Sequence, residues 1–130
     1  MPFVRITTLG DRLSPDQVGR LQDGTTELMV SVMRKGLGGI SILVEEAGEG
    51  SWSIAGKSVP VAAHVEATIG VGTNTPEEKA RFMKGMMELL RTVLGQGLRD
   101  ETYIAFHEFD HDSYGRGGIT RSERERRSAA

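Results

Sequence analysis

Pro2, directly after Met1, is the residue with the clearest capacity for chemistry. Removal of Met1 would leave a secondary amine whose ring holds the nitrogen lone pair in a nearly fixed direction. An α-amino group titrates near ~8, and partial burial beside a cationic side chain would lower its pKa toward neutrality, where a general base works best. The alternative is structural, because a proline here can simply begin a strand without an N–H. Residue type alone leaves both interpretations open.

Other reactive residue types are placed less favourably. His107 and His111 would share a metal ion on a helix, but they begin in a predicted strand, where four residues span about 13 Å. Ser51 and Ser113 lie in predicted hairpins without a histidine and an acid placed beside them. The sequence therefore predicts no metal site, no serine-hydrolase triad and no cofactor.

Composition limits the remaining classes of protein. The 130 residues are 38% hydrophobic and 26% charged, which fits one compact domain. A formal net charge of −2 gives no electrostatic reason to expect nucleic acid or an anionic membrane as a partner. No signal peptide and no apolar run of the ~20 residues needed to span a bilayer is recognisable. A cytoplasmic protein is therefore the expectation. The lack of cysteines excludes disulfides.

The two halves of the chain share one order of elements. Residues 3–9 read as a strand, 14–33 as a helix, 40–44 as a second strand and 48–56 as a hairpin. Each helix begins with a cap, a proline and a capping-box residue, in Ser14-Pro15-Asp16-Gln17 and in Thr75-Pro76-Glu77-Glu78. A shift of 61 positions aligns the helices, and a shift of 62 aligns the hairpins, with Trp52 on Tyr114. The chain therefore reads as a duplication of a unit of about 60 residues.

This order predicts an α/β (α+β) fold. Each unit is a β-α-β crossover with parallel strands, so two units give a four-stranded sheet with both long helices on one face. The uncovered face would expose Ile and Val side chains and is expected to meet a partner subunit. The predicted single domain covers residues 1–120, with repeats 2–57 and 60–120, and residues 121–130 are expected to be a disordered tail.

An N-terminal Pro2 together with a tandem β-α-β unit resembles the tautomerase superfamily, over about residues 2–120. The chain is most similar to 4-oxalocrotonate tautomerase in its fused, double-length form, which implies a homotrimer. The resemblance implies that Pro2 is the general base, that Arg12 binds a substrate carboxylate, and that Trp52 and Ile54 form an apolar wall.

One family residue is missing. The second arginine, which polarises the carbonyl side of the substrate, falls on Ser41 in the first unit and on Tyr103 in the second. Tyr103 could donate a hydrogen bond to an enolate, or Arg116 could bring a cation from the second hairpin, and we favour Arg116. Pro60, the counterpart of Pro2, is an internal amide and cannot be a base, so one active site per chain is expected.

The resulting hypothesis is an isomerase that interconverts the enol and keto forms of a small unsaturated 2-hydroxy or 2-oxo carboxylate. Two alternatives stay open at this point. Relatives on the same fold dehalogenate, hydrate or decarboxylate their substrates, and a trimeric binding protein could keep the scaffold without catalysis.

Overall fold

The computed structural model describes residues 2–129 of the chain. In chain order its elements are β1 (Phe3–Leu9), α1 (Pro15–Ser31), the 3-10 turn η1 (Leu37–Gly39), β2 (Ser41–Glu46), β3 (Ser53–Ile54), β4 (Lys57–Ser58), β5 (Ala62–Gly70), α2 (Pro76–Leu94), β6 (Tyr103–Phe109), β7 (Gly115–Arg116), β8 (Ile119–Thr120) and α3 (Arg121–Ala129). Apart from η1, the elements up to β8 follow the predicted order, in which one unit is repeated.

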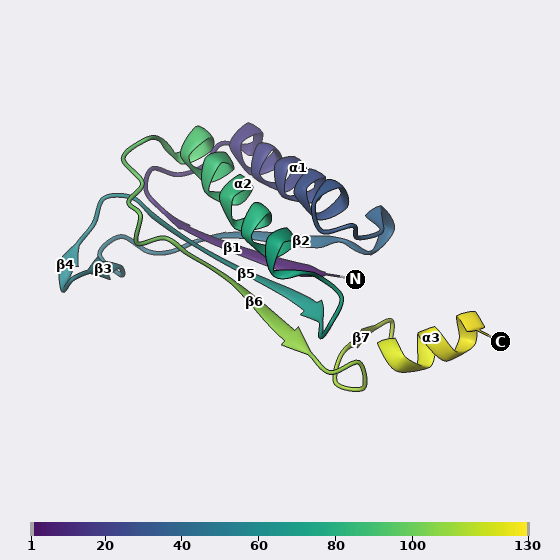
Figure 1. Cartoon of the computed structure of the whole chain (residues 1–130). Coiled ribbons are helices and arrows are strands. Elements are labelled where there is room, and N and C mark those ends of the chain that lie inside the picture. The colour runs from purple at the N-terminus through teal and green to yellow at the C-terminus, as the bar shows by residue number, and fades with distance from the viewer. Residues whose placement is uncertain (1, 130) are drawn as a thin grey trace.

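The strands β2, β1, β5 and β6 lie side by side, in that order, in one sheet (Figure 1). Within each unit the strands are parallel, β1 with β2 and β5 with β6. The two units meet at the centre of the sheet, where β1 and β5 are antiparallel and Ile6 lies opposite Val65. The predicted α+β fold of two β-α-β units in a four-stranded sheet is confirmed.

Both long helices begin at the predicted capping boxes. Ser14 Oγ accepts a hydrogen bond from the Gln17 N–H at 3.1 Å, and Gln17 Oε1 accepts one from the Ser14 N–H at 2.9 Å. Thr75 and Glu78 repeat this arrangement at the start of α2, with the same two distances. Both helices cover the same face of the sheet (Figure 1). Among residues 2–129, no helix is both long and apolar enough to cross a membrane.

Two glycines let the helices approach each other closely. A Cβ atom at Gly24 of α1 would lie 2.7 Å from Leu89 Cδ1, and one at Gly85 of α2 would lie 2.6 Å from Leu28 Cδ2. The two contacts are related by the repeat, because each pairs a glycine of one helix with a leucine of the other. The duplication is therefore preserved in the packing as well as in the order of elements.

The uncovered face of the sheet differs from the expectation. Val4 and Ile6 are fully buried, whereas Arg5 between them is exposed and forms an ion pair with Glu45, at 3.3 Å. The expectation that Ile and Val side chains would be exposed on this face is wrong. Side chains alternate between the two faces along a strand, and the Ile and Val side chains of β1 and β5 lie on the face that the helices cover. The uncovered face carries mainly polar and charged side chains there.

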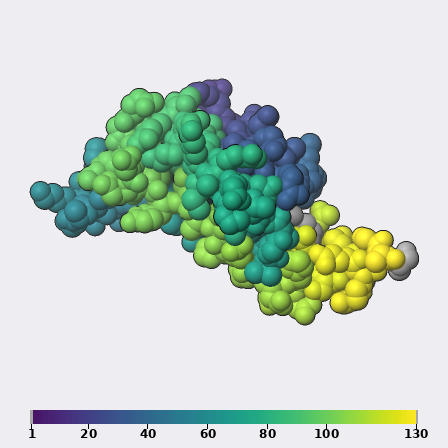
Figure 2. Space-filling model, in the orientation of Figure 1, coloured from purple at the N-terminus to yellow at the C-terminus, as the bar shows by residue number. Residues whose placement is uncertain are grey.

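The last residues also differ from the expectation of a disordered tail, because residues 121–129 form the helix α3. Thr120 Oγ1 accepts a hydrogen bond from the Glu123 N–H at 3.1 Å, which caps its first turn. Arg121 and Glu125, and Glu123 and Arg127, form ion pairs four residues apart, at 2.7 Å and 3.1 Å. The alternating charges that suggested a solvated tail thus stabilise a helix. It projects from one end of the molecule (yellow in Figure 2).

Candidate active site

Pro2 is buried at the edge of the sheet where β1 and β2 begin. Its carbonyl oxygen accepts a hydrogen bond from the Ser41 N–H at 3.1 Å, which joins the start of β1 to the start of β2. The next residue, Phe3, donates its N–H to Thr68 Oγ1 at 3.0 Å, near the end of β5. These bonds fix the position of the proline ring relative to both units. Met1 lies outside the described residues.

A cavity of about 240 Å³ opens beside Pro2, and we call it the proline cavity. Its lining includes Pro2 and Ser41 from the first unit, and Phe109, Tyr114 and Arg116 from the second. The topology explains this arrangement. Since β5 and β6 run antiparallel to β1, they end where β1 begins, and the hairpin β7–β8 that follows β6 lies beside Pro2.

The hairpin holds Arg116 at this cavity through its glycines. A side chain at Gly115 would collide with the backbone carbonyl of Ile119, the next strand's first residue. Gly117 and Gly118 have φ angles of 62° and 80°, in the left-handed region that glycine adopts without strain. Arg116 in β7 remains exposed. The structure therefore brings together Pro2, Ser41 and Arg116, three of the residues singled out in the sequence.

A second and larger cavity, of about 600 Å³, shares Arg116 with the proline cavity. We call it the cationic cavity, because its charged lining consists of Arg34, Lys35, Arg116, Arg121, Arg124 and Glu125. Lys35 Nζ donates a hydrogen bond to Thr73 Oγ1 at 3.1 Å. Burial, and then the positive charges of Arg121 and Arg34, lower the pKa of the half-buried Lys35 to about 8.

Lys35 was not predicted from the sequence as a site residue. It precedes Gly36 and follows the apolar stripe of the predicted helix. A lysine in that position is typical of a helix C-terminus and does not indicate a site. Tyr114 was also missed as a site residue. The repeat contains a signal for it, because a shift of 62 places Trp52 on Tyr114, and only the cavity gives that position a role.

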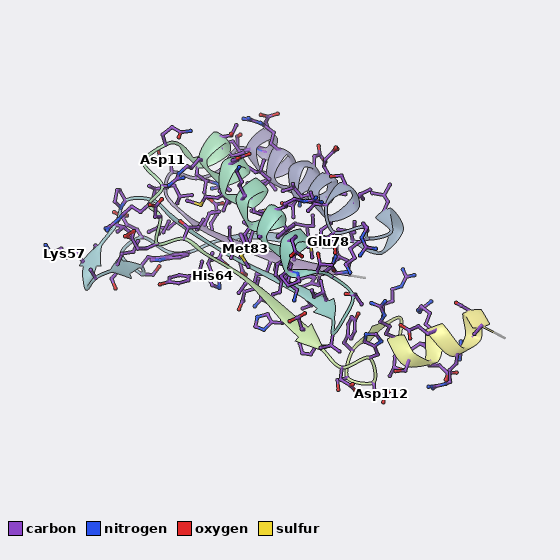
Figure 3. The ribbon with its side chains drawn as sticks, in the orientation of Figure 1. Asp11, Lys57, His64, Glu78, Met83 and Asp112 are labelled. Atoms are coloured by element: carbon purple, nitrogen blue, oxygen red, sulfur yellow. The ribbon has the colours of Figure 1, made fainter. Side chains whose placement is uncertain are left out.

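The other predicted site residues lie at the opposite end of the sheet. Trp52, Ile54 and Tyr103 line a third cavity, of about 390 Å³. Arg12 is exposed in the turn after β1. Its neighbour Asp11 lies toward the hairpin β3–β4, far from Glu78 at the start of α2 (Figure 3).

The length of β1 separates these residues from Pro2 within one chain. Seven residues of strand, at ~3.3 Å each, span roughly 23 Å. The expectation that Trp52 forms the wall beside Pro2 is thus not met inside a single chain, where Phe109 and Tyr114 occupy that place. The hairpin β3–β4 of the first unit lies beside the start of β5, and the hairpin β7–β8 of the second unit lies beside the start of β1. This exchange occurs because β1 and β5 are antiparallel.

Comparisons with known proteins agree with this architecture. The family model described as tautomerase enzyme matches residues 2–62. Among curated protein sequences, none matches the chain. The Q0 fused 4-OT wild type symmetric trimer is 14% identical, with a TM-score of 0.82 over 94% of this chain and 98% of that chain.

Two further solved structures have the same fold. The R7 fused 4-OT wild type asymmetric trimer is 20% identical, with a TM-score of 0.80 over 92% of this chain and 96% of that chain. A macrophage migration inhibitory factor-like protein from Entamoeba histolytica is 15% identical, with a TM-score of 0.77 over 92% and 97% of the two chains. The resemblance predicted from the sequence is therefore confirmed: residues 2–62 match the tautomerase family model, and the chain as a whole has the fold of the fused 4-OT proteins.

Proposed function

We propose that this protein is a tautomerase in which the amine of Pro2, released by removal of Met1, is the general base. The observation that carries the proposal is the burial of Pro2 in a cavity that also contains Arg116. A buried amine beside a guanidinium has a lowered pKa, because burial and the nearby positive charge both disfavour the protonated amine. Such an amine is largely unprotonated near neutral pH, as a general base must be.

The proposed reaction moves one proton through this amine. The Pro2 nitrogen accepts the hydroxyl proton of a bound enol while the O–H electron pair forms the new C=O bond. The electrons of the former C=C bond take up a proton from the Pro2 ammonium at carbon, which regenerates the neutral amine. Arg116 would stabilise the negative charge that develops on the oxygen, and Arg12 of a neighbouring chain would bind the substrate carboxylate. The substrate class is therefore a small unsaturated 2-hydroxy or 2-oxo carboxylate.

We propose in addition that the protein acts as a homotrimer. The fused 4-OT structures named above are trimers, and the chain shares their fold. In a trimer, Arg12 and Trp52 of a neighbouring chain could reach the proline cavity that they cannot reach within their own chain. Arg12 would then bind a substrate carboxylate, and Trp52 would extend the apolar wall.

The test compares Pro2→Ala with Pro60→Ala in the ketonisation of 2-hydroxymuconate or phenylenolpyruvate, followed by absorbance. Mass spectrometry of the purified protein first establishes whether Met1 has been removed. Pro2→Ala should lower kcat by about 10²-fold, in line with the contribution of a positioned general base. Pro60 is an exposed internal residue of the second unit, so its variant should keep the wild-type rate.

Equal rates for the wild type and Pro2→Ala would contradict the proposal. That outcome would favour the binding-protein alternative, which draws its support from the uncharged residues Ser41 and Tyr103 at the positions of the family's second arginine. Turnover of a halogenated acrylate without ketonisation would favour the same-fold hydratase alternative instead.

A further inference from the structure

The cationic cavity has more positive charge than the proposed isomerisation uses. It lies among the end of α1, the turn after β5, the hairpin β7–β8 and α3. Five of its lining side chains are basic and one is acidic, a formal excess of four positive charges. The chain as a whole has a formal net charge of −2, so this excess is local. Such a concentration of cations in a hollow raises the local concentration of anions.

The acidic groups near the cavity are already engaged. Glu125 contacts Arg121 Nε at 2.7 Å and His111 Nδ1 at 3.3 Å. Arg34 forms its ion pair outside the cavity lining, with Glu78, at 2.6 Å. Among the contacts of residues 2–129, neither Lys35 nor Arg124 has a carboxylate partner. Within the described residues, these two cations that face the cavity form no ion pair with a carboxylate, although the charge of Glu78 also acts on Lys35.

Each of these two cations has one hydrogen-bond acceptor within residues 2–129. Lys35 Nζ contacts only the hydroxyl of Thr73 in the described part of the chain. Arg124 Nη2 donates to the carbonyl oxygen of Arg116 at 3.1 Å, whereas the buried Nε of Arg124 has no hydrogen-bond partner in residues 2–129. A buried donor without an acceptor costs free energy, and an oxyanion in the cavity would remove that cost.

We propose that the cationic cavity binds a phosphate group, held by Lys35 and Arg124 with Arg121 at its edge. A phosphate offers several acceptor oxygens in a tetrahedral arrangement and close to two negative charges, which matches donors from the segment after α1 and from α3. A cavity of about 600 Å³ exceeds the size of the bare ion, so the phosphate of a small monoester also fits. The two cavities share Arg116, but the proposed phosphate ligands Lys35, Arg124 and Arg121 take no part in the Pro2 chemistry, so this site does not rest on the proposed function.

Calorimetric titration with inorganic phosphate tests the site without any activity measurement. Phosphate is added at pH 7.5 against chloride at matched ionic strength, to the wild type and to Lys35→Gln. Lys35→Gln should weaken phosphate binding at least about tenfold, as expected for the loss of a charge-assisted hydrogen bond. Lys84→Gln, which removes an exposed lysine of α2, should leave the affinity within about twofold of the wild type.

A second variant tests the contribution of α3. Arg124→Gln should weaken phosphate binding like Lys35→Gln, and its matched control is Arg20→Gln on the exposed surface of α1. Circular dichroism shows whether α3 keeps its helicity in Arg124→Gln. Lys35 lies outside α3, so its variant remains decisive even if the helix is lost. Glycerol 3-phosphate in place of inorganic phosphate shows whether the cavity favours a monoester over the free ion.

Proton uptake gives an independent signature. Sulfate remains a dianion across pH 6–9, so any proton taken up on sulfate binding comes to the protein. An anion favours the charged form of Lys35, whose pKa of about 8 would rise on binding, and uptake should be measurable at pH 8. Uptake should vanish in Lys35→Gln. Equal affinity for phosphate in the wild type, Lys35→Gln and Arg124→Gln, or no binding above chloride, would overturn the proposal.

Discussion

Pro2 of the first unit and Arg116 of the second line the same cavity, although they lie near opposite ends of the chain. The antiparallel pairing of β1 with β5 makes this possible, because it brings the end of β6 and its hairpin to the start of β1. One chain thereby combines a candidate base with a cation from its duplicated half.

Arg116→Gln should lower kcat/KM for enol ketonisation by about 10²-fold. It removes the guanidinium that would stabilise the developing oxyanion, a contribution of the size known for single oxyanion donors. Steady-state kinetics of Arg116→Gln beside Arg20→Gln, an exposed arginine of α1, measure the effect. Wild-type kcat/KM in Arg116→Gln would exclude it from the site and leave Tyr103 of a neighbouring chain as the remaining candidate.

Arg12→Gln should raise KM several-fold while kcat changes little. The reason is that Arg12 would bind a substrate carboxylate from a neighbouring chain in the ground state and the transition state alike. The effect therefore requires assembly, which analytical ultracentrifugation measures on the same sample. A trimer with unchanged KM in Arg12→Gln would refute the role of this arginine.

Glu78→Gln should reduce stability at neutral pH, with a difference that shrinks in acid. Hydrogen bonds from Arg34, from the Thr75 N–H and from the Asn74 amide hold the pKa of Glu78 well below its usual range. A depressed folded-state pKa stabilises the fold above the unfolded pKa, and this contribution is lost as pH falls through the folded value.

Thermal unfolding of Glu78→Gln and wild type between pH 7 and pH 3 measures the difference. Glu77→Gln, an exposed carboxylate one residue earlier in α2, is the control and should change the melting temperature little. A constant gap between Glu78→Gln and wild type over this range would contradict the linkage.

Gly19→Ala and Gly24→Ala should have opposite effects, although both lie in α1. No atom lies within 4 Å of a Cβ built at Gly19, so alanine there should stabilise by about 0.5–1 kcal/mol through helix propensity. At Gly24 the new methyl group would meet Leu89 at 2.7 Å, which should offset that gain or reverse it. Urea unfolding of both variants is the measurement, and equal stabilisation of the two would show that the helices separate at no cost.

Much of the architecture was predictable because its signals are local. Capping boxes at Ser14 and Thr75, and the alternation of Val4 and Ile6 with polar residues, depend on neighbours in sequence. Because these signals occur in both halves of the chain, they indicate two β-α-β units. Pro2 was a candidate base because of its position, and the family resemblance favoured that role over a structural one. The helix α3 was missed, because alternating charges are equally compatible with a solvated tail.

The sequence by itself determined the two units, the tautomerase resemblance and the candidate base. Only the tertiary structure decided which hairpin faces Pro2, because that depends on whether β1 and β5 pair parallel or antiparallel, and no local pattern encodes this choice. The antiparallel pairing puts Tyr114 and Arg116 beside Pro2 and sends Trp52 to the opposite end. Lys35 likewise acquired its environment from α3, an element distant in sequence, since its lowered pKa depends on burial and on the charge of Arg121.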